Sequence, residues 1–196
     1  VYQLSPEDIK KVNPNTGTCP IFRNKEEADV VVGIYDGCTV LMPENEENDW
    51  GLDISRMYNA GDDAGLFVKR GNIDKQNTGV SIVKAIESDS DYIPVYESKM
   101  IHQYDHRFAS YEGLSDDQID NKKPEKMEVV EKNDPDHEVE PPHWVSVDEY
   151  TKKWNDDSWH LVLRGVTNVT NRRTTISSLI PATATEHTLN HILQAS

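Results

Sequence analysis

The sequence is poor in several classes of residue, and each shortage excludes a class of protein. Only two of its 196 residues are cysteines, Cys19 and Cys38. Two isolated thiols form neither a disulfide framework nor a zinc cluster, so a reducing, cytoplasmic compartment is the simplest expectation. No apolar run reaches the roughly 18 residues of a membrane-spanning helix. We therefore expect no membrane partner, and no signal peptide either.

Hydrophobic and basic residues are also scarce. Hydrophobic residues make up 36% of the chain, which predicts extended loops around its core. The length still suits one domain, so we expect a single domain over residues 1–196, excised from a larger protein. Twenty basic residues face 35 acidic ones, and the net charge is −15. Because nucleic-acid surfaces are usually basic, this charge weighs against the chain binding DNA alone.

The acidic residues are concentrated in two stretches. Eleven acidic residues and four lysines fall in Glu112–Glu140, and seven acidic residues and one arginine fall in Glu44–Asp63. Acidic runs are usually solvated loops, so both stretches are expected to face away from any DNA. We interpret residues 112–145, which also contain prolines, as a long and partly disordered excursion. The last forty residues are locally positive.

Capping and alternation patterns predict the elements of secondary structure. Signals that start helices occur at three places: at Ser5 with Pro6, at Asn24, and at Ser146 with Glu149. Alternation predicts a half-buried strand over Trp159–Arg164. We further expect strands over Cys38–Met42 and Thr174–Ile180 and a helix over Glu186–Leu193, whereas Asp53–Tyr58 and Val80–Ile86 stay undecided. The predicted fold class is α+β, with a mixed or antiparallel sheet, several short helices and a long acidic loop.

The stretch Ile93–Tyr111 is the densest in side chains suited to recognition or chemistry. Arginine and lysine bind phosphates or guanine edges, and aromatic rings stack on bases, so this mixture is typical of nucleic-acid surfaces. On a strand, Val95, Glu97 and Lys99 would share one face. The candidate DNA contacts are Lys99, Gln103, His106 and Arg107, framed by Tyr96, Tyr104 and Tyr111. The alternative is a buried strand with a polar edge.

A second candidate region is the polar loop Thr167–Thr175. Asparagine can bond the adenine edge in two places, and arginine can bond the guanine edge. These preferences select Asn171, Arg172, Arg173 and Thr174 as further candidate DNA contacts. The alternative is structural: Arg173 ties the loop to the acidic surface, and Thr174 starts the next strand.

Four blocks of the chain, in order, resemble large adenine-specific DNA methyltransferases of the type IIG restriction–modification and phage-exclusion kinds, which serve bacterial defence. The blocks are Leu4–Leu41, Asp49–Phe67, the stretch around Lys-Met-Ile-His-Gln-Tyr-Asp-His-Arg-Phe at 99–108, and Trp159–Pro181. In that family the third block lies downstream of the methyltransferase core, in the region associated with target recognition. Asn171, Arg173 and Thr174 match the family's Asn-x-Arg-Thr, with Arg172 where glutamate is usual.

The resemblance implies a division of labour. A separate domain of the parent protein would bind S-adenosylmethionine and methylate a flipped adenine, while this chain would help to read and hold double-stranded DNA. This chain has neither a glycine-rich cofactor turn nor an Asn/Asp-Pro-Pro-Tyr/Phe clamp, so we expect no catalytic residue and no cofactor in it. Its second partner would be the methyltransferase domain of the same chain.

Three other interpretations stay open. The chain could be a structural brace between the methyltransferase core and the true recognition domain, which the charge of −15 favours. Glu97-Ser98-Lys99, with Asp91 before it, could form a metal-dependent nuclease centre, in which two carboxylates hold magnesium. His102 and His106 could bind zinc, although no cysteine partner is evident.

Overall fold

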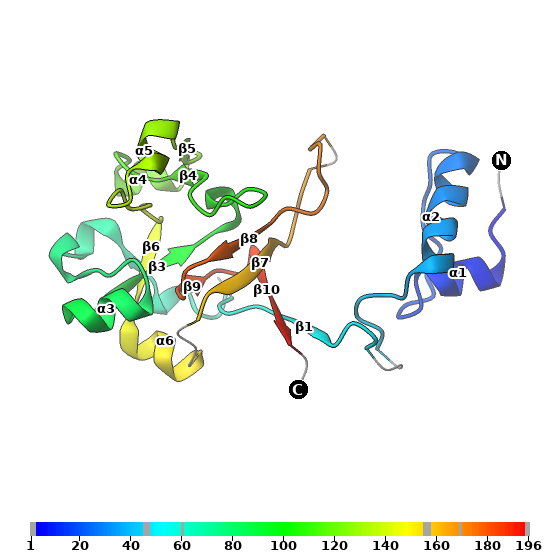
Figure 1. The fold of residues 1–196 in the computed structure, drawn as a ribbon, viewed down its shortest axis with the longest axis horizontal. Coiled ribbons are helices and arrows are strands. Elements are labelled where there is room, and N and C mark those ends of the chain that lie inside the picture. The colour runs from blue at the N-terminus through cyan, green and yellow to red at the C-terminus, as the bar shows by residue number, and fades with distance from the viewer. Residues whose placement is uncertain (1–2, 45–47, 60, 155–157, 169, 195–196) are drawn as a thin grey trace. The chain divides into compact units, whose positions relative to one another are not determined.

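The computed structural model describes residues 3–44, 48–59, 61–154, 158–168 and 170–194 (Figure 1). The chain divides into two compact units, a smaller one of Val1–Asp53 with Gln194–Ser196 and a larger one of Ile54–Leu193. Each unit has its own architecture. The expectation of a single domain stays a prediction.

The smaller unit contains two helices that begin where the capping residues predict. Helix α1 (Pro6–Val12) starts after Ser5, whose hydroxyl accepts a hydrogen bond from the third helical N–H. Helix α2 (Lys25–Gly37) starts after Asn24, whose side chain does the same. Ala28 is the only buried residue among those described in this unit. The unit therefore has almost no core of its own.

The segment that follows α2 differs from expectation. The described residues of Cys38–Met42 form no strand and pair with no partner strand, so the predicted strand is wrong. Cys19 and Cys38 are exposed free thiols. No helix in the described part of the chain is long and apolar enough to cross a membrane.

The larger unit holds two four-stranded sheets and one strand pair. The first sheet has the order β1-β10-β7-β8, the second β2-β6-β3-β9, and β4 pairs with β5. Strand β3 pairs in parallel with β9, and the other strand pairs whose register is described are antiparallel, so the predicted α+β class is confirmed. The strands are β1 Leu52–Ser55, β2 Val68–Lys69, β3 Tyr92–Tyr96, β4 Ala109–Ser110, β5 Glu125–Lys126, β6 His143–Ser146, β7 His160–Arg164, β8 Ser177–Ile180, β9 Ala184–Thr185 and β10 Leu189–Gln194.

Short helices connect these strands. Ser146 caps the last of them, as predicted, by accepting a hydrogen bond from the N–H of Glu149. The α-helices are α3 Ile82–Ser88, α4 Asp116–Ile119, α5 Val129–Asn133 and α6 Val147–Lys153, and the 3₁₀ helices are η1 Ala64–Leu66, η2 Arg70–Asn72, η3 Lys75–Asn77 and η4 Ser98–Met100. Gly79 is required ahead of α3, because a Cβ there would lie 2.5 Å from the backbone nitrogen of Ala85.

The helix predicted over Glu186–Leu193 is wrong. Residues 189–193 instead lie in β10, which pairs antiparallel with β7, Leu189 opposite Arg164 and His191 opposite Val162. Leu189 and His191 are fully buried, whereas Asn190 between them is half-buried. This alternation is that of a strand with one face on the core.

The acidic excursion is folded, and its two ends are tied together. The N–H of Tyr111 donates to the carbonyl of Glu140 at 2.9 Å, and the N–H of Glu140 donates to the hydroxyl of Ser110 at 3.0 Å. The nearly buried carboxylate of Glu140 also pairs with Arg70 and Lys75. Between these ends, α4, β5 and α5 pack beside one another (Figure 1), and the segment supplies Ile119, Met127 and Val139 to a buried cluster with Tyr96 and Ile180.

Candidate nucleic-acid interface

The structure brings the two candidate regions of the sequence together. A tight turn over His102–Asp105 lies against Ser177, the first residue of β8. The N–H of Tyr104 donates to the Ser177 carbonyl at 2.9 Å. The side-chain oxygen of Gln103 accepts a bond from the Ser177 N–H at 3.2 Å, although the two residues are 74 apart in sequence. The turn thus contacts the chain directly after the polar loop, and we call residues 102–107 together with the described residues of 165–176 the candidate interface.

The second part of this surface is the connection between β7 and β8, which projects from its sheet (Figure 1). Its conformation is set by its own polar groups. The hydroxyl of Thr167 donates to the carbonyl of Thr174 at 2.6 Å and closes the base of the loop. The N–H of Asn171 donates to the carbonyl of Asn168 at 2.9 Å and forms a turn at its tip. Val169 lies outside the described residues.

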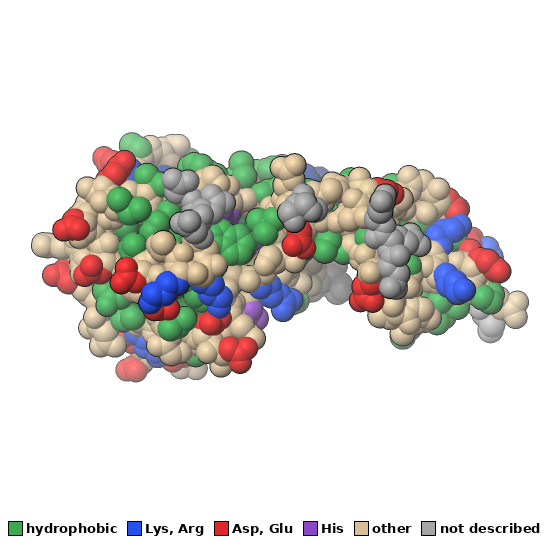
Figure 2. Space-filling view, turned by 90° about the horizontal axis from the view of Figure 1, so that it is seen from below, with side chains coloured by type: hydrophobic (Ala, Val, Ile, Leu, Met, Phe, Trp, Pro, Cys, Tyr) green, Lys and Arg blue, Asp and Glu red, His purple; other side chains and the backbone are tan. Residues whose placement is uncertain are grey.

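The charge of this hairpin differs from that of the rest of the chain. No acidic residue lies between Asp157 and Glu186, and this stretch contains three arginines. Arg164 faces inward and donates to the Ile101 carbonyl. Arg172 and Arg173 are exposed, and neither forms a hydrogen bond or ion pair through its side chain in the described part of the chain. Acidic side chains are, by contrast, scattered over the face of the larger unit shown in Figure 2.

Arg107 and His106 have internal partners. The Arg107 guanidinium donates to the carbonyls of Glu131 at 2.6 Å and Asp134 at 3.0 Å, which holds the acidic segment in place. The His106 ring meets the Trp159 ring edge to face, with the centroids 5.8 Å apart. Burial is the main cause that lowers the His106 pKa, and the neighbouring Arg107 adds to it. These two side chains are thus already used by the fold.

The positions of three further candidate residues, Tyr96, Tyr111 and Lys99, also differ from those expected. Tyr96 and Tyr111 are buried, so they frame the region from inside the core and offer no free face for stacking. The Tyr111 hydroxyl donates to the buried carboxylate of Glu97, and Lys99 lies 3.3 Å from the same carboxylate. The expectation that Lys99 shares a strand face with Glu97 is wrong. Strand β3 ends at Tyr96, and Lys99 falls in the 3₁₀ helix η4.

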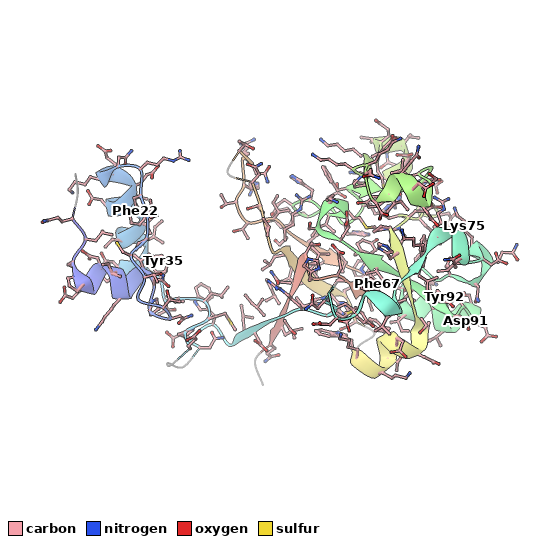
Figure 3. The ribbon with its side chains drawn as sticks, turned by 180° about the vertical axis from the view of Figure 1, so that it is seen from behind. Phe22, Tyr35, Phe67, Lys75, Asp91 and Tyr92 are labelled. Atoms are coloured by element: carbon pink, nitrogen blue, oxygen red, sulfur yellow. The ribbon has the colours of Figure 1, made fainter. Side chains whose placement is uncertain are left out.

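The residues of the nuclease hypothesis are not assembled. Asp91 and Glu97 flank the two ends of β3 and are separated by roughly 20 Å of extended chain. Asp91, which is labelled next to Tyr92 in Figure 3, instead accepts a bond from the Asn77 amide at 2.7 Å. The predicted pair of carboxylates at Asp91 and Glu97 is therefore wrong. Among the described residues, no group of three or more metal-ligating side chains is suitably placed.

Two lysines that the sequence did not single out add positive charge beside the turn. Lys126 and Lys132 lie 5.3 Å and 5.7 Å from the centre of the Phe108 ring. Burial is the main cause that lowers the pKa of His102, and the charge of Arg164 is the second. The two lysines also lower this pKa, whereas the charge of Asp105 raises it. Asp105 is in turn paired with Lys132 at 2.5 Å. No sequence signal revealed these lysines, because both lie within the acidic segment.

A cleft of about 600 Å³ lies on the larger unit and is partly lined by Tyr96, His106 and Arg107. Its charged lining also includes one lysine and three acidic residues, Lys84, Glu87, Asp136 and Glu138. Acidic groups thus outnumber basic ones at its rim. Phosphate would be repelled there, so the exposed hairpin is the better candidate for DNA contact.

No family model matches the chain, and comparisons with curated proteins and with solved structures gave no significant match. Function is therefore inferred from the geometry and charge of the candidate interface, and the resemblance seen in the sequence stays a prediction.

Proposed function

We propose that this chain is a DNA target-recognition part of an adenine-specific DNA methyltransferase of the restriction–modification or phage-exclusion kind. It would hold duplex DNA while a separate domain of the same protein, carrying S-adenosylmethionine, methylates the adenine. This proposal is based on two exposed arginines, Arg172 and Arg173, whose side chains have no partner among the described residues and which lie on a hairpin free of acidic residues. No catalytic role is assigned to this chain.

The hairpin has the size and chemistry for duplex DNA. The part that would reach the groove is the connection between β7 and β8, at the edge of the four-stranded sheet β1-β10-β7-β8, because the major groove admits elements about as wide as two strands. At its tip, the arginines suit phosphates or guanine edges, and Asn171 with Thr174 suits adenine or phosphate oxygens. The arginines need not give up an internal ion pair in order to bind DNA.

The test measures binding of the chain to a fluorescein-labelled duplex of mixed sequence by fluorescence anisotropy across a salt series. Replacing Arg172 and Arg173 together with alanine should weaken binding at least tenfold at low salt and reduce the salt slope by about 2. The matched control replaces Lys122 and Lys123, which are adjacent and exposed in the acidic segment. Equal losses in the two double variants would show that the hairpin has no special role.

A brace that touches no base is the second candidate function. The internal bonds of Gln103 and Arg107 favour it, because both side chains hold parts of the unit together. Methylation mapping by long-read sequencing, in a host that expresses the intact parent protein, separates the two functions. Recognition predicts that R173A relaxes or shifts the methylated motif, whereas a brace predicts an unchanged motif with evenly reduced methylation.

A further inference from the structure

The turn of the candidate interface presents an aromatic ring in an unusual way. Tyr104 is 83% exposed, more than any other described aromatic side chain among the exposed hydrophobic residues. Its backbone has a φ of +60°, in the left-handed region that favours glycine. Only one other described non-glycine residue, Asp89, has a positive φ, and it caps the end of α3, where aspartate is common. A strained backbone that displays a tyrosine to solvent needs an explanation.

The surrounding structure holds this conformation firmly. His102 and Asp105 exchange two backbone hydrogen bonds, of 2.7 Å and 3.0 Å, across the turn. The N–H of Tyr104 itself is bound to the Ser177 carbonyl at the base of the hairpin, and Gln103 adds a side-chain bond to the same residue. The ring is therefore displayed from a rigid base rather than from a loose loop, which lowers the entropy lost when it binds.

The ring also lies in a setting that suits nucleic acid. Three residues separate Ser177 from Arg173 on the hairpin. Lys126 and Lys132 lie near the ring of Phe108, four residues after Tyr104, and Lys132 neutralises Asp105, the one carboxylate of the turn. Aromatic side chains between cationic groups stack on bases, while the cations bind the neighbouring phosphates.

We propose that Tyr104 is an aromatic wedge that stacks against a nucleobase where the duplex is opened, while Arg172 and Arg173 hold the adjacent phosphates. Inserted side chains of this kind unstack a base step or fill the gap left by a displaced base. An enzyme that must extrude its target base needs such a filler, because unstacking is costly. This inference rests on the proposed function and gives one residue a role in it.

The test compares two labelled duplexes of identical sequence, one intact and one with a single abasic site. The unaltered protein should bind the abasic duplex about tenfold more tightly, in line with the stacking of one base on one aromatic ring. Y104A should lose this preference and Y104F should keep it. I86A, which removes an exposed side chain from α3, should leave it unchanged.

A melting experiment separates the wedge from a structural role. Y104G should raise the Tm, because glycine adopts a φ of +60° without strain, and it should still lose the preference for the abasic duplex. A fall in Tm for Y104G, with the preference intact in Y104A, would overturn the proposal. If the unaltered protein binds neither duplex, the proposed function and the wedge fail together. If it binds both and only R172A with R173A weakens binding, the wedge alone is wrong.

Discussion

The two halves of the candidate interface contain similar side chains that are used in opposite ways. In the turn at 102–107, Gln103 and Arg107 bond to distant parts of the larger unit. In the hairpin loop, Arg172 and Arg173 bond to nothing in the described part of the chain. Composition alone would rank both regions as equally good DNA surfaces. The comparison teaches that a polar side chain is a candidate for recognition only after its internal partners have been counted.

The difference has a physical origin. Arg107 precedes a buried strand and lies beneath a folded acidic segment, whose backbone carbonyls need donors. The hairpin loop projects from its sheet and closes its own backbone bonds through Thr167 and Asn168. Its arginines are therefore not needed for folding. A mutation should thus affect stability in one region and DNA binding in the other.

The largest expected effect is the loss of stability in R107A. Removing the guanidinium leaves the carbonyls of Glu131 and Asp134 without their donor, which should lower the free energy of unfolding by about 2 kcal/mol. Urea denaturation measures this change. R172A is the matched control and should stay within about 0.5 kcal/mol of the unaltered protein. Similar losses in both variants would remove the distinction between the two regions.

A smaller loss is expected for Q103A, which breaks the side-chain link between the turn and β8. The N–H of Ser177 loses its acceptor, so the free energy of unfolding should fall by about 1 kcal/mol. DNA affinity should also fall, because the turn and the hairpin lose part of their connection. S177A keeps the backbone N–H and should cost less. If Q103A unfolds at the same urea concentration as the unaltered protein, the two regions are not coupled through this contact.

The smallest effect is a dependence of stability on pH that arises in the turn and not in the loop. Burial is the main cause that lowers the pKa values of His102, His106 and His143. The folded state thus binds these protons more weakly than the unfolded state, and stability is lost as the pH falls below about 6.5. H106Q should reduce this loss in urea denaturation between pH 7.5 and 5.5.

R173A serves as the control for this pH series. Because arginine stays charged throughout, the free energy of unfolding of R173A should change with pH by the same amount as that of the unaltered protein. The carboxyl groups of Glu138, which is exposed, and Glu186, which is half-buried, act in the opposite sense. Burial raises their pKa values, so they favour the folded state as the pH falls. The comparison of variants isolates the histidines from this background. If the free energy of unfolding depends on pH equally in H106Q and R173A, His106 contributes nothing to the pH dependence of stability.

The sequence predicted those parts of the fold that are encoded locally. Ser5, Asn24 and Ser146 start helices through bonds to residues within one turn, so their signals were sufficient. β10 was mistaken for a helix because its conformation depends on pairing with Val162–Arg164, which lies far away in the sequence. The acidic composition of 112–145 hid the buried side chains of Leu114, Ile119, Met127 and Val139 and the bonds that fold the segment.

The candidate site was predictable only in part, for the same reason. The residue types at 99–107 and 171–174 indicated nucleic-acid chemistry, but no local pattern shows that the two segments meet at Ser177. Nor does a pattern show that Tyr96 and Tyr111 are buried while Tyr104 is exposed. The left-handed backbone of Tyr104 singles that residue out in the structure. It could not be predicted from the sequence, because this conformation is usually signalled by glycine and the residue here is tyrosine.

The closure of the acidic segment at Glu140 has a consequence for how such a protein can vary. Because Tyr111 and Glu140 are hydrogen-bonded to each other, everything between them leaves and re-enters the unit at one point. Residues could be added or removed in the exposed turn at 121–123 without changing the pairing of β4 with β5 or the bonds of Arg107 to Glu131 and Asp134. The acidic segment carries most of the net negative charge of the larger unit, so that charge could vary while the hairpin stays unchanged.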